Sequence, residues 1–186
     1  MPENQRSAER SQELCCKFFT AAVRQGEISR YHLWELHRDL CPDPCPYPIP
    51  VPVQAHFEGV IISAVAVEDK IAMAISQLLG DKTGDEDKNR RIFEKLTSHI
   101  EGLRCWLQKP IRKDLRAVRA LVVHQFSNKR PDAPGLVIEK PSSEYGESPE
   151  LREYCFAAVK HAHELTDLIP ELKRELWRRL SARRSA

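Results

Sequence analysis

Apolar positions recur at helical spacing along most of the chain, and this pattern predicts an all-α fold. The two N-terminal segments 3–25 and 28–40 each carry apolar side chains three or four positions apart, so we predict two helices that separate at Gly26. Residues 54–79 are apolar on nearly every face, as expected of a buried helix. We therefore predict a helical bundle with 54–79 as its central rod, packed against residues 89–107, 111–126 and 150–168 and followed by a basic last helix.

Two segments break the helical pattern. The stretch CPDPCPYPIPVPV, residues 41–53, has proline at every second position, which excludes helix and favours an extended polyproline strap of roughly 40 Å. Residues 127–149 hold four Pro, two Gly and four Ser, which predicts a long loop that is either functional or mobile. We accordingly divide the chain into N-terminal helices and a proline-rich strap, 1–53, and a helical bundle, 54–186, within one structural domain.

Composition supports helix, and the charge distribution points to a basic region. The chain has 186 residues and only seven Gly, and it is rich in Leu, Ala, Glu, Lys and Arg, so it can bury a core and favours helix over strand. The net charge is only +2. Residues 88–130, however, hold twelve Lys or Arg against three acids, a local charge of +9 that leaves −7 for the rest of the chain. A basic surface of this kind fits an anionic partner such as RNA.

The cysteines and the apolar runs indicate a cytoplasmic protein without a membrane anchor. The six cysteines are scattered, and the first residues, MPENQRSAER, include no apolar leader, so we expect reduced thiols in the cytosol. The longest apolar run, Gly59 to Val67, is about half the length that a bilayer requires.

One stretch, RALVVHQF at residues 119–126, places two potentially reactive side chains on one predicted helix. On a helical wheel at about 100° per residue, with Arg116 at 0°, the apolar positions form a core arc between about 140° and 280°. Arg119 falls near 300° and His124 near 80°, and the arc between them holds small, apolar or basic residues without a carboxylate.

This face has the groups needed for phosphodiester chemistry on RNA. A histidine near neutral pKa can move the proton of a 2′-hydroxyl or of a leaving group, and an arginine fork can hold a phosphate as negative charge develops. We therefore assign His124 as general acid or base and Arg119 as the phosphate-binding catalytic residue, with Arg116 and Arg112 as substrate-binding residues. One helix supplies only one histidine, so a two-fold homodimer would be needed to place an acid and a base beside one phosphate.

At this point the chain resembles the HEPN superfamily, all-helical dimers whose ribonuclease members carry Arg, four to six residues, then His near the start of a late bundle helix. RALVVH has four intervening residues, follows an apolar helix and a basic helix, and precedes an irregular loop, much like the abortive-infection branch. The resemblance covers about residues 54–180 and implies a metal-independent endoribonuclease of toxin or antiphage type, with a possible cognate antitoxin. The family usually has a polar residue directly after the Arg, and this chain has Ala120.

Three functions remain open on these residues. The first is the ribonuclease, and the second is a non-catalytic HEPN-like dimer that binds a nucleotide, RNA or a partner protein through the same basic face. Ala120 distinguishes them, since it removes the usual polar helper. The third is a helical interaction protein in which Arg119 and His124 are ordinary solvated residues and the strap and the loop hold a partner.

The remaining cysteines and histidines favour structural roles, and we expect no metal and no cofactor. Cys41 and Cys45 flank prolines and have no second ligand pair nearby, which makes a poor zinc site. The other thiols are expected in the core: Cys15, Cys16, Cys105 and Cys155. Two histidines are expected on the surface, His161 and His163, and two in structural positions on helices, His56 and His99.

Overall fold

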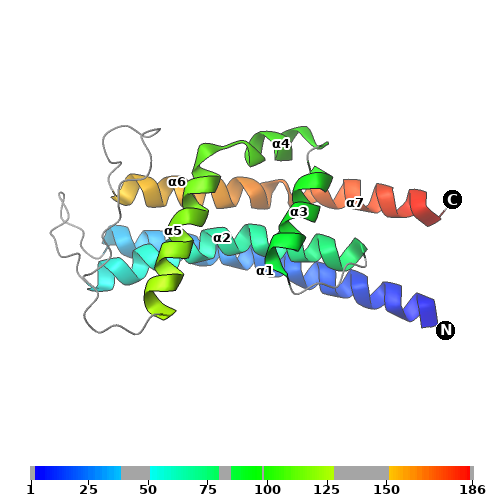
Figure 1. Cartoon of the computed structure of the whole chain (residues 1–186), viewed down its shortest axis with the longest axis horizontal. Coiled ribbons are helices and arrows are strands. Elements are labelled where there is room, and N and C mark those ends of the chain that lie inside the picture. Colours follow the sequence, from blue (N-terminus) through cyan, green and yellow to red (C-terminus); the bar gives the residue numbers. More distant parts are fainter. Residues whose placement is uncertain (1–2, 39–50, 80–84, 98, 128–150, 185–186) are drawn as a thin grey trace. The chain divides into compact units, whose positions relative to one another are not determined.

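The computed structural model of the chain is all-α, which confirms the predicted fold class (Figure 1). It describes residues 3–38, 51–79, 85–97, 99–127 and 151–184, and within these ranges it contains seven helices and no strand. The helices are α1 (Glu3–Arg38), α2 (Val51–Leu79), α3 (Glu86–Thr97), α4 (Glu101–Leu107), α5 (Pro110–Ser127), α6 (Leu151–Asp167) and α7 (Ile169–Arg184). Most of the proline strap and nearly all of the 127–149 loop lie outside the described residues.

The chain forms two compact units. The first unit comprises residues 1–24, 66–108 and 163–186, and the second comprises 25–65 and 109–162. Helices α1, α2 and α6 therefore each contribute one part to either unit. The division of the chain after residue 53 stays a prediction.

Helix α2 is the buried helix that its apolar sequence predicts. It begins at Val51, three residues earlier than expected, because Pro52 lies in the first turn, where a helix does not need the missing N–H. Of the side chains described between residues 55 and 79, only Ala55 and Ile62 are exposed. Its core residues are Phe57, Val60, Ile61 and Ala64 in the second unit and Val67, Ile71, Ala74 and Ile75 in the first.

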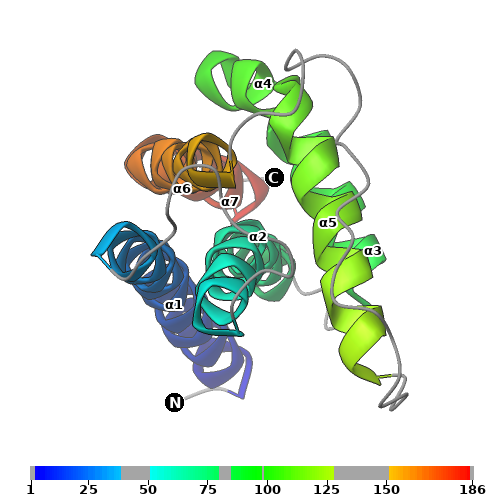
Figure 2. The same cartoon turned by 90° about the vertical axis from the view of Figure 1, so that its left-hand side faces the viewer.

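The second unit joins parts of four helices. Its portions of α1, α2 and α6 run side by side in both views, and α5 crosses α2 and α6 steeply (Figures 1 and 2). Phe57 of α2 meets Tyr154 of α6 with ring centroids 6.5 Å apart. Helix α5 adds its own buried stripe to this unit, formed by Ile111, Leu115 and Val118.

Helix α1 is continuous, so the predicted break at Gly26 is wrong. Its buried positions alternate in steps of four and three residues straight through that glycine: Cys15, Phe19, Ala22, Gly26, Ser29, Leu33 and Leu36. A stripe with this spacing needs one unbroken helix to present one buried face. Burying it outweighs the roughly 1 kcal/mol that a glycine costs inside a helix, and the Ser29 hydroxyl donates a hydrogen bond to the Gly26 carbonyl at 2.8 Å.

Residues 89–107 form two helices instead of the single helix predicted. Helix α3 ends at Thr97, and Ile100 is extended, with φ −102° and ψ 116°, before α4 begins at Glu101. The break lets Phe93 and Trp106 pack edge to face with centroids 6.3 Å apart. In one straight helix these two residues would be separated by about 20 Å along the axis.

The first unit is completed by the C-terminal end of α6 and the whole of α7. Gly102 of α4 packs so closely on Leu168 that an added Cβ would lie 2.9 Å from its Cδ2 atom. On α7, the Lys173 ammonium lies 5.1 Å from the ring centroid of Phe19 on α1, a cation–π contact. Within the described part of the chain, no helix combines the length and the apolar character needed to cross a membrane.

Candidate functional site

The residues assigned to phosphodiester chemistry lie on α5, which is uninterrupted from Pro110 to Ser127. Proline is favoured in the first turn of a helix, and the Arg112 N–H donates to the Lys109 carbonyl at 3.1 Å, which closes that turn. Arg119 and His124 thus belong to one helix, as the motif requires. The side chain of His124 lies outside the residues whose side chains the structure describes.

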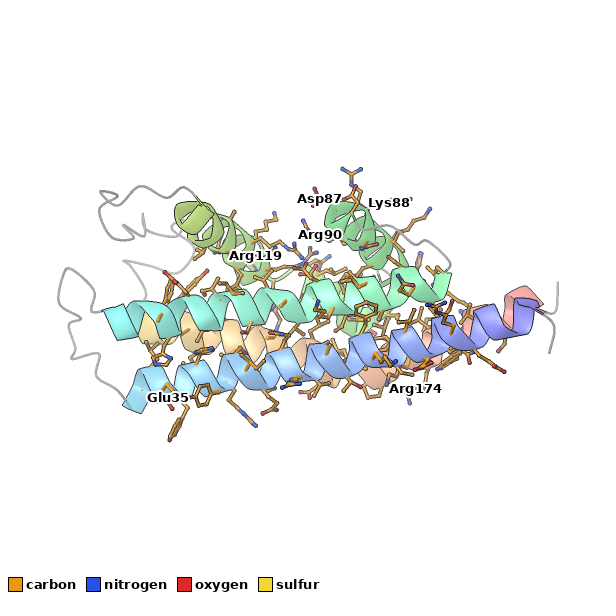
Figure 3. The ribbon with its side chains drawn as sticks, turned by 90° about the horizontal axis from the view of Figure 1, so that it is seen from below. Glu35, Asp87, Lys88, Arg90, Arg119 and Arg174 are labelled. Atoms are coloured by element: carbon orange, nitrogen blue, oxygen red, sulfur yellow. The ribbon has the colours of Figure 1, made fainter. Side chains whose placement is uncertain are left out.

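The three arginines of α5 form one stripe beside the buried face, which we call the arginine stripe: Arg112, Arg116 and Arg119. At about 100° per residue they fall within about 60° of one another, and each is half-buried. The Nε atoms of Arg116 and Arg119 and one terminal nitrogen of Arg116 are shielded from solvent, and none of the three residues is free of interactions within the protein. Figure 3 labels Arg119 on α5.

Burial separates the α5 residues outside the core face into two groups. The outer part of the helix carries the exposed residues Lys113, Ala117 and Ala120, whereas Arg116 and Arg119 lie at the boundary of the buried face. The shielded nitrogens face the protein, so a ligand can accept hydrogen bonds only from the remaining terminal nitrogens of Arg116 and Arg119. The stripe can hold a phosphate through these nitrogens.

Helix geometry fixes the separation of positions 119 and 124 on α5. Position 124 lies five residues after Arg119, which corresponds to about 140° around the axis and about 7.5 Å along it. The two positions of one α5 helix therefore do not converge on one point. A phosphate that met both kinds of side chain would have to lie between α5 and a second element, such as α5 of a second copy.

The structure also brings together a group of residues that the sequence reasoning missed. His99, Ile100 and Glu101, at the turn between α3 and α4, face a cleft of about 660 Å³ together with five charged residues of α7: Glu171, Arg174, Glu175, Arg178 and Arg179. His99 is exposed in this turn, not on a helix as predicted. The group could not be found from the sequence because it depends on the break between α3 and α4.

The charges of this cleft are largely compensated. Arg178 donates from Nε and from a terminal nitrogen to the Glu175 carboxylate, each at 2.8 Å, and Arg179 donates from Nε at 2.7 Å. These hydrogen bonds, first of all those from Arg178, lower the pKa of Glu175 to about 2. Three carboxylates thus face three guanidinium groups in this cleft, so its charges balance.

A third site is a pair of histidines on α1 and α2. The Nδ1 atoms of His32 and His56 lie 3.2 Å apart. The partner of His56 was not foreseen, because 24 residues and the proline strap separate the two histidines in the sequence.

The other cysteine and histidine predictions are partly wrong. Cys15 and Cys155 are buried as expected, but Cys16 and Cys105 are exposed, and His161, expected on the surface, is only 5% exposed. Cys41 and Cys45 lie outside the described residues. Among the residues that are described, no three His, Cys, Asp or Glu side chains are grouped so as to hold a metal ion.

Comparisons with models of known families, with curated proteins and with solved structures find no match to this chain.

Proposed function

We propose that the chain is an RNA-directed protein of the HEPN type, a metal-independent endoribonuclease that acts on single-stranded RNA through a composite site in a homodimer. The observation that supports this most directly is that Arg119 and His124 share one unbroken helix with the half-buried arginine stripe. The local charge of +9 over residues 88–130 favours the same polyanionic substrate.

In the proposed reaction the 2′-oxygen of one nucleotide attacks the adjacent phosphorus, and the bond from phosphorus to the 5′-oxygen breaks. One His124 imidazole accepts the proton of the 2′-hydroxyl, and a protonated His124 imidazole of the second copy gives a proton to the departing 5′-oxygen. Arg119 stabilises the charge on the non-bridging oxygens, while Arg112 and Arg116 hold the neighbouring backbone. The products are a 2′,3′-cyclic phosphate and a free 5′-hydroxyl, so no metal ion or other reactant is consumed.

A second candidate function is RNA or nucleotide binding without cleavage. Ala120 is exposed and small at the position where ribonucleases of the resembled family usually carry a polar side chain. The arginine stripe already interacts within the protein, which suits binding as well as catalysis. Toxin or antiphage activity and a cognate antitoxin are further proposals that follow from the resemblance.

Substitutions on α5 test the proposal and separate the two functions. A fluorescent single-stranded RNA is incubated with the protein in EDTA, and the cleavage products and RNA binding are both measured. We expect His124→Ala to abolish cleavage with binding retained, and Arg119→Ala to lower cleavage and also to weaken binding at low salt, since a phosphate contact carries part of the affinity.

The matched control is Lys113→Ala, which removes an exposed cation from the outer face of the same helix. It should leave the cleavage rate within about twofold of wild type. If wild type binds RNA without cleaving it, the binding function replaces the ribonuclease. If Arg119→Ala and His124→Ala both cleave and bind RNA as wild type does, neither function belongs to this site on α5.

A further inference from the structure

Two imidazole rings meet where α1 and α2 lie side by side in the second unit. The Nδ1 atoms of His32 and His56 are 3.2 Å apart, and the rings are tilted by 49° with centroids 5.5 Å apart. Both side chains are half-buried, so this pair is neither sealed in the core nor fully in solvent. The residues belong to neither the arginine stripe nor the cleft on α7.

The backbone of α2 leaves space for the ring of His32, which belongs to α1. This ring lies against Gly59, where an added Cβ would be only 2.6 Å from the ring atoms Cγ, Cδ2 and Nε2. On its own helix, the ring of Tyr31 contacts His32 edge to face at 5.6 Å. A glycine inside a buried helix costs about 1 kcal/mol relative to alanine, and here it provides the space that the imidazole occupies.

Two nitrogens in this arrangement can share a proton or a metal ion. With a neutral pair, one Nδ1–H donates to the lone pair of the other. Alternatively, both lone pairs can bind one cation: bonds of about 2.05 Å at a tetrahedral angle place two ligand nitrogens about 3.3 Å apart, close to the 3.2 Å seen here. The two imidazoles therefore already have the separation of two corners of a tetrahedral site.

We propose that His32 and His56 form a binding site for a divalent late first-row transition metal ion of the Zn²⁺ class. Imidazole ligands favour zinc, copper and nickel over magnesium and calcium. Because no third protein ligand stands nearby among the described residues, water fills the remaining positions and the site is an open one.

A buried carboxylate close to the pair supports a cation there. Glu35 lies three residues after His32, on the same side of α1, and is only 5% exposed (Figure 3). A carboxylate this near the two imidazoles can offset part of the charge of a bound cation.

Calorimetric titration with Zn²⁺ and Ni²⁺ tests the site on the full chain, with thiols kept reduced and EDTA removed. We expect saturable binding that His32→Ala and His56→Ala each weaken at least tenfold. His99→Ala, which removes an exposed histidine from the first unit, is the control and should bind as wild type. Metal binding to the cysteine thiols is the same in all these proteins, so the difference in affinity between the variants and wild type measures the contribution of the histidine pair.

A pair of glycine substitutions tests the geometry without removing a ligand. Gly59→Ala should push the His32 ring away from α2 and weaken metal binding at least fivefold, while circular dichroism shows unchanged helix content. Gly102→Ala makes the same chemical change in the first unit, against Leu168, and should leave the affinity unchanged. The proposal is overturned if the His32→Ala and His56→Ala variants bind as wild type, or if all the variants weaken binding equally.

Discussion

At the scale of single residues, adjacent side chains on α1 have opposite environments. Cys15 is buried, and loss of solvent around its sulfur, more than the neighbouring Cys16, raises its pKa to about 12. Cys16, the next residue, is exposed. Because the thiolate is the reactive form, burial protects Cys15 twice, by access and by protonation.

We therefore predict that iodoacetamide at pH 8 modifies Cys16 at least tenfold faster than Cys15 in the folded protein. Fragmentation of the alkylated peptide by mass spectrometry locates the label on one cysteine or the other. In a denaturant the two rates should become similar, which serves as the control. Equal rates in the folded protein would mean that Cys15 is not in the core.

Glu175 gives a second residue-scale prediction, on the response to acid. Its pKa is lowered to about 2 by the hydrogen bonds from Arg178 and Arg179, so the folded state binds its proton less readily than the unfolded state does. Its stabilising contribution is therefore complete above the ordinary pKa of about 4.5 and is lost as the pH falls toward 2.

We expect the free energy of unfolding of Glu175→Gln to fall less steeply between pH 4.5 and 2 than that of wild type. Urea titrations at several pH values measure this slope. Glu171→Gln, in the same cleft, is the control and should retain the wild-type slope. Identical slopes for wild type and Glu175→Gln would show that the Arg178 and Arg179 hydrogen bonds do not persist in solution.

At the scale of elements, the α3–α4 turn depends on one aromatic contact more than on its own residues. Ile100 is the N-cap residue of α4 and makes no side-chain hydrogen bond to that helix start. Trp106 is 3% exposed and packs on Phe93, whereas Trp177 of α7 is 39% exposed. The two tryptophans thus offer a matched comparison.

Trp106→Ala should lower the free energy of unfolding by about 3–5 kcal/mol, because it leaves a large cavity between α3 and α4. Trp177→Ala should cost less than about 1 kcal/mol. Denaturation followed by circular dichroism measures both losses. Each variant keeps two of the three tryptophans, so fluorescence would report different residues in the two proteins. Similar losses for the two variants would contradict the packing described for α4.

At the scale of the whole molecule, the composite site makes a quantitative prediction about mixing. If cleavage needs His124 from both copies, a heterodimer of wild type and His124→Ala is inactive. The activity of equilibrated mixtures should then fall with the square of the wild-type fraction instead of in proportion to it. Light scattering should report twice the 21.4 kDa mass of the chain at micromolar concentration.

Mixtures of wild type with Lys113→Ala serve as the control and should keep full activity. A linear fall with His124→Ala would show that each chain cleaves RNA alone, and a monomer in light scattering would exclude the composite site. Neither result would bear on the histidine pair of α1 and α2, whose metal binding is measured without RNA.

The amino-acid sequence by itself determines the helical fold and most helix positions. The apolar character of α2, the proline at the start of α5, and the spacing of Ile111, Leu115 and Val118 are local properties of the chain, and helix formation follows them. The continuity of α1 through Gly26 is not among these properties, because the sequence predicted a stop there and the spacing of the buried positions is a property of the fold.

Tertiary structure decided which residues from distant segments of the sequence contact one another. The break before α4 brings Phe93 and Trp106 into contact, and no local residue pattern records that contact. The meeting of His32 with His56, and the burial of His161, depend on which helices become neighbours. Helical periodicity fixes the direction of a side chain around its own axis, but only packing fixes what that side chain faces.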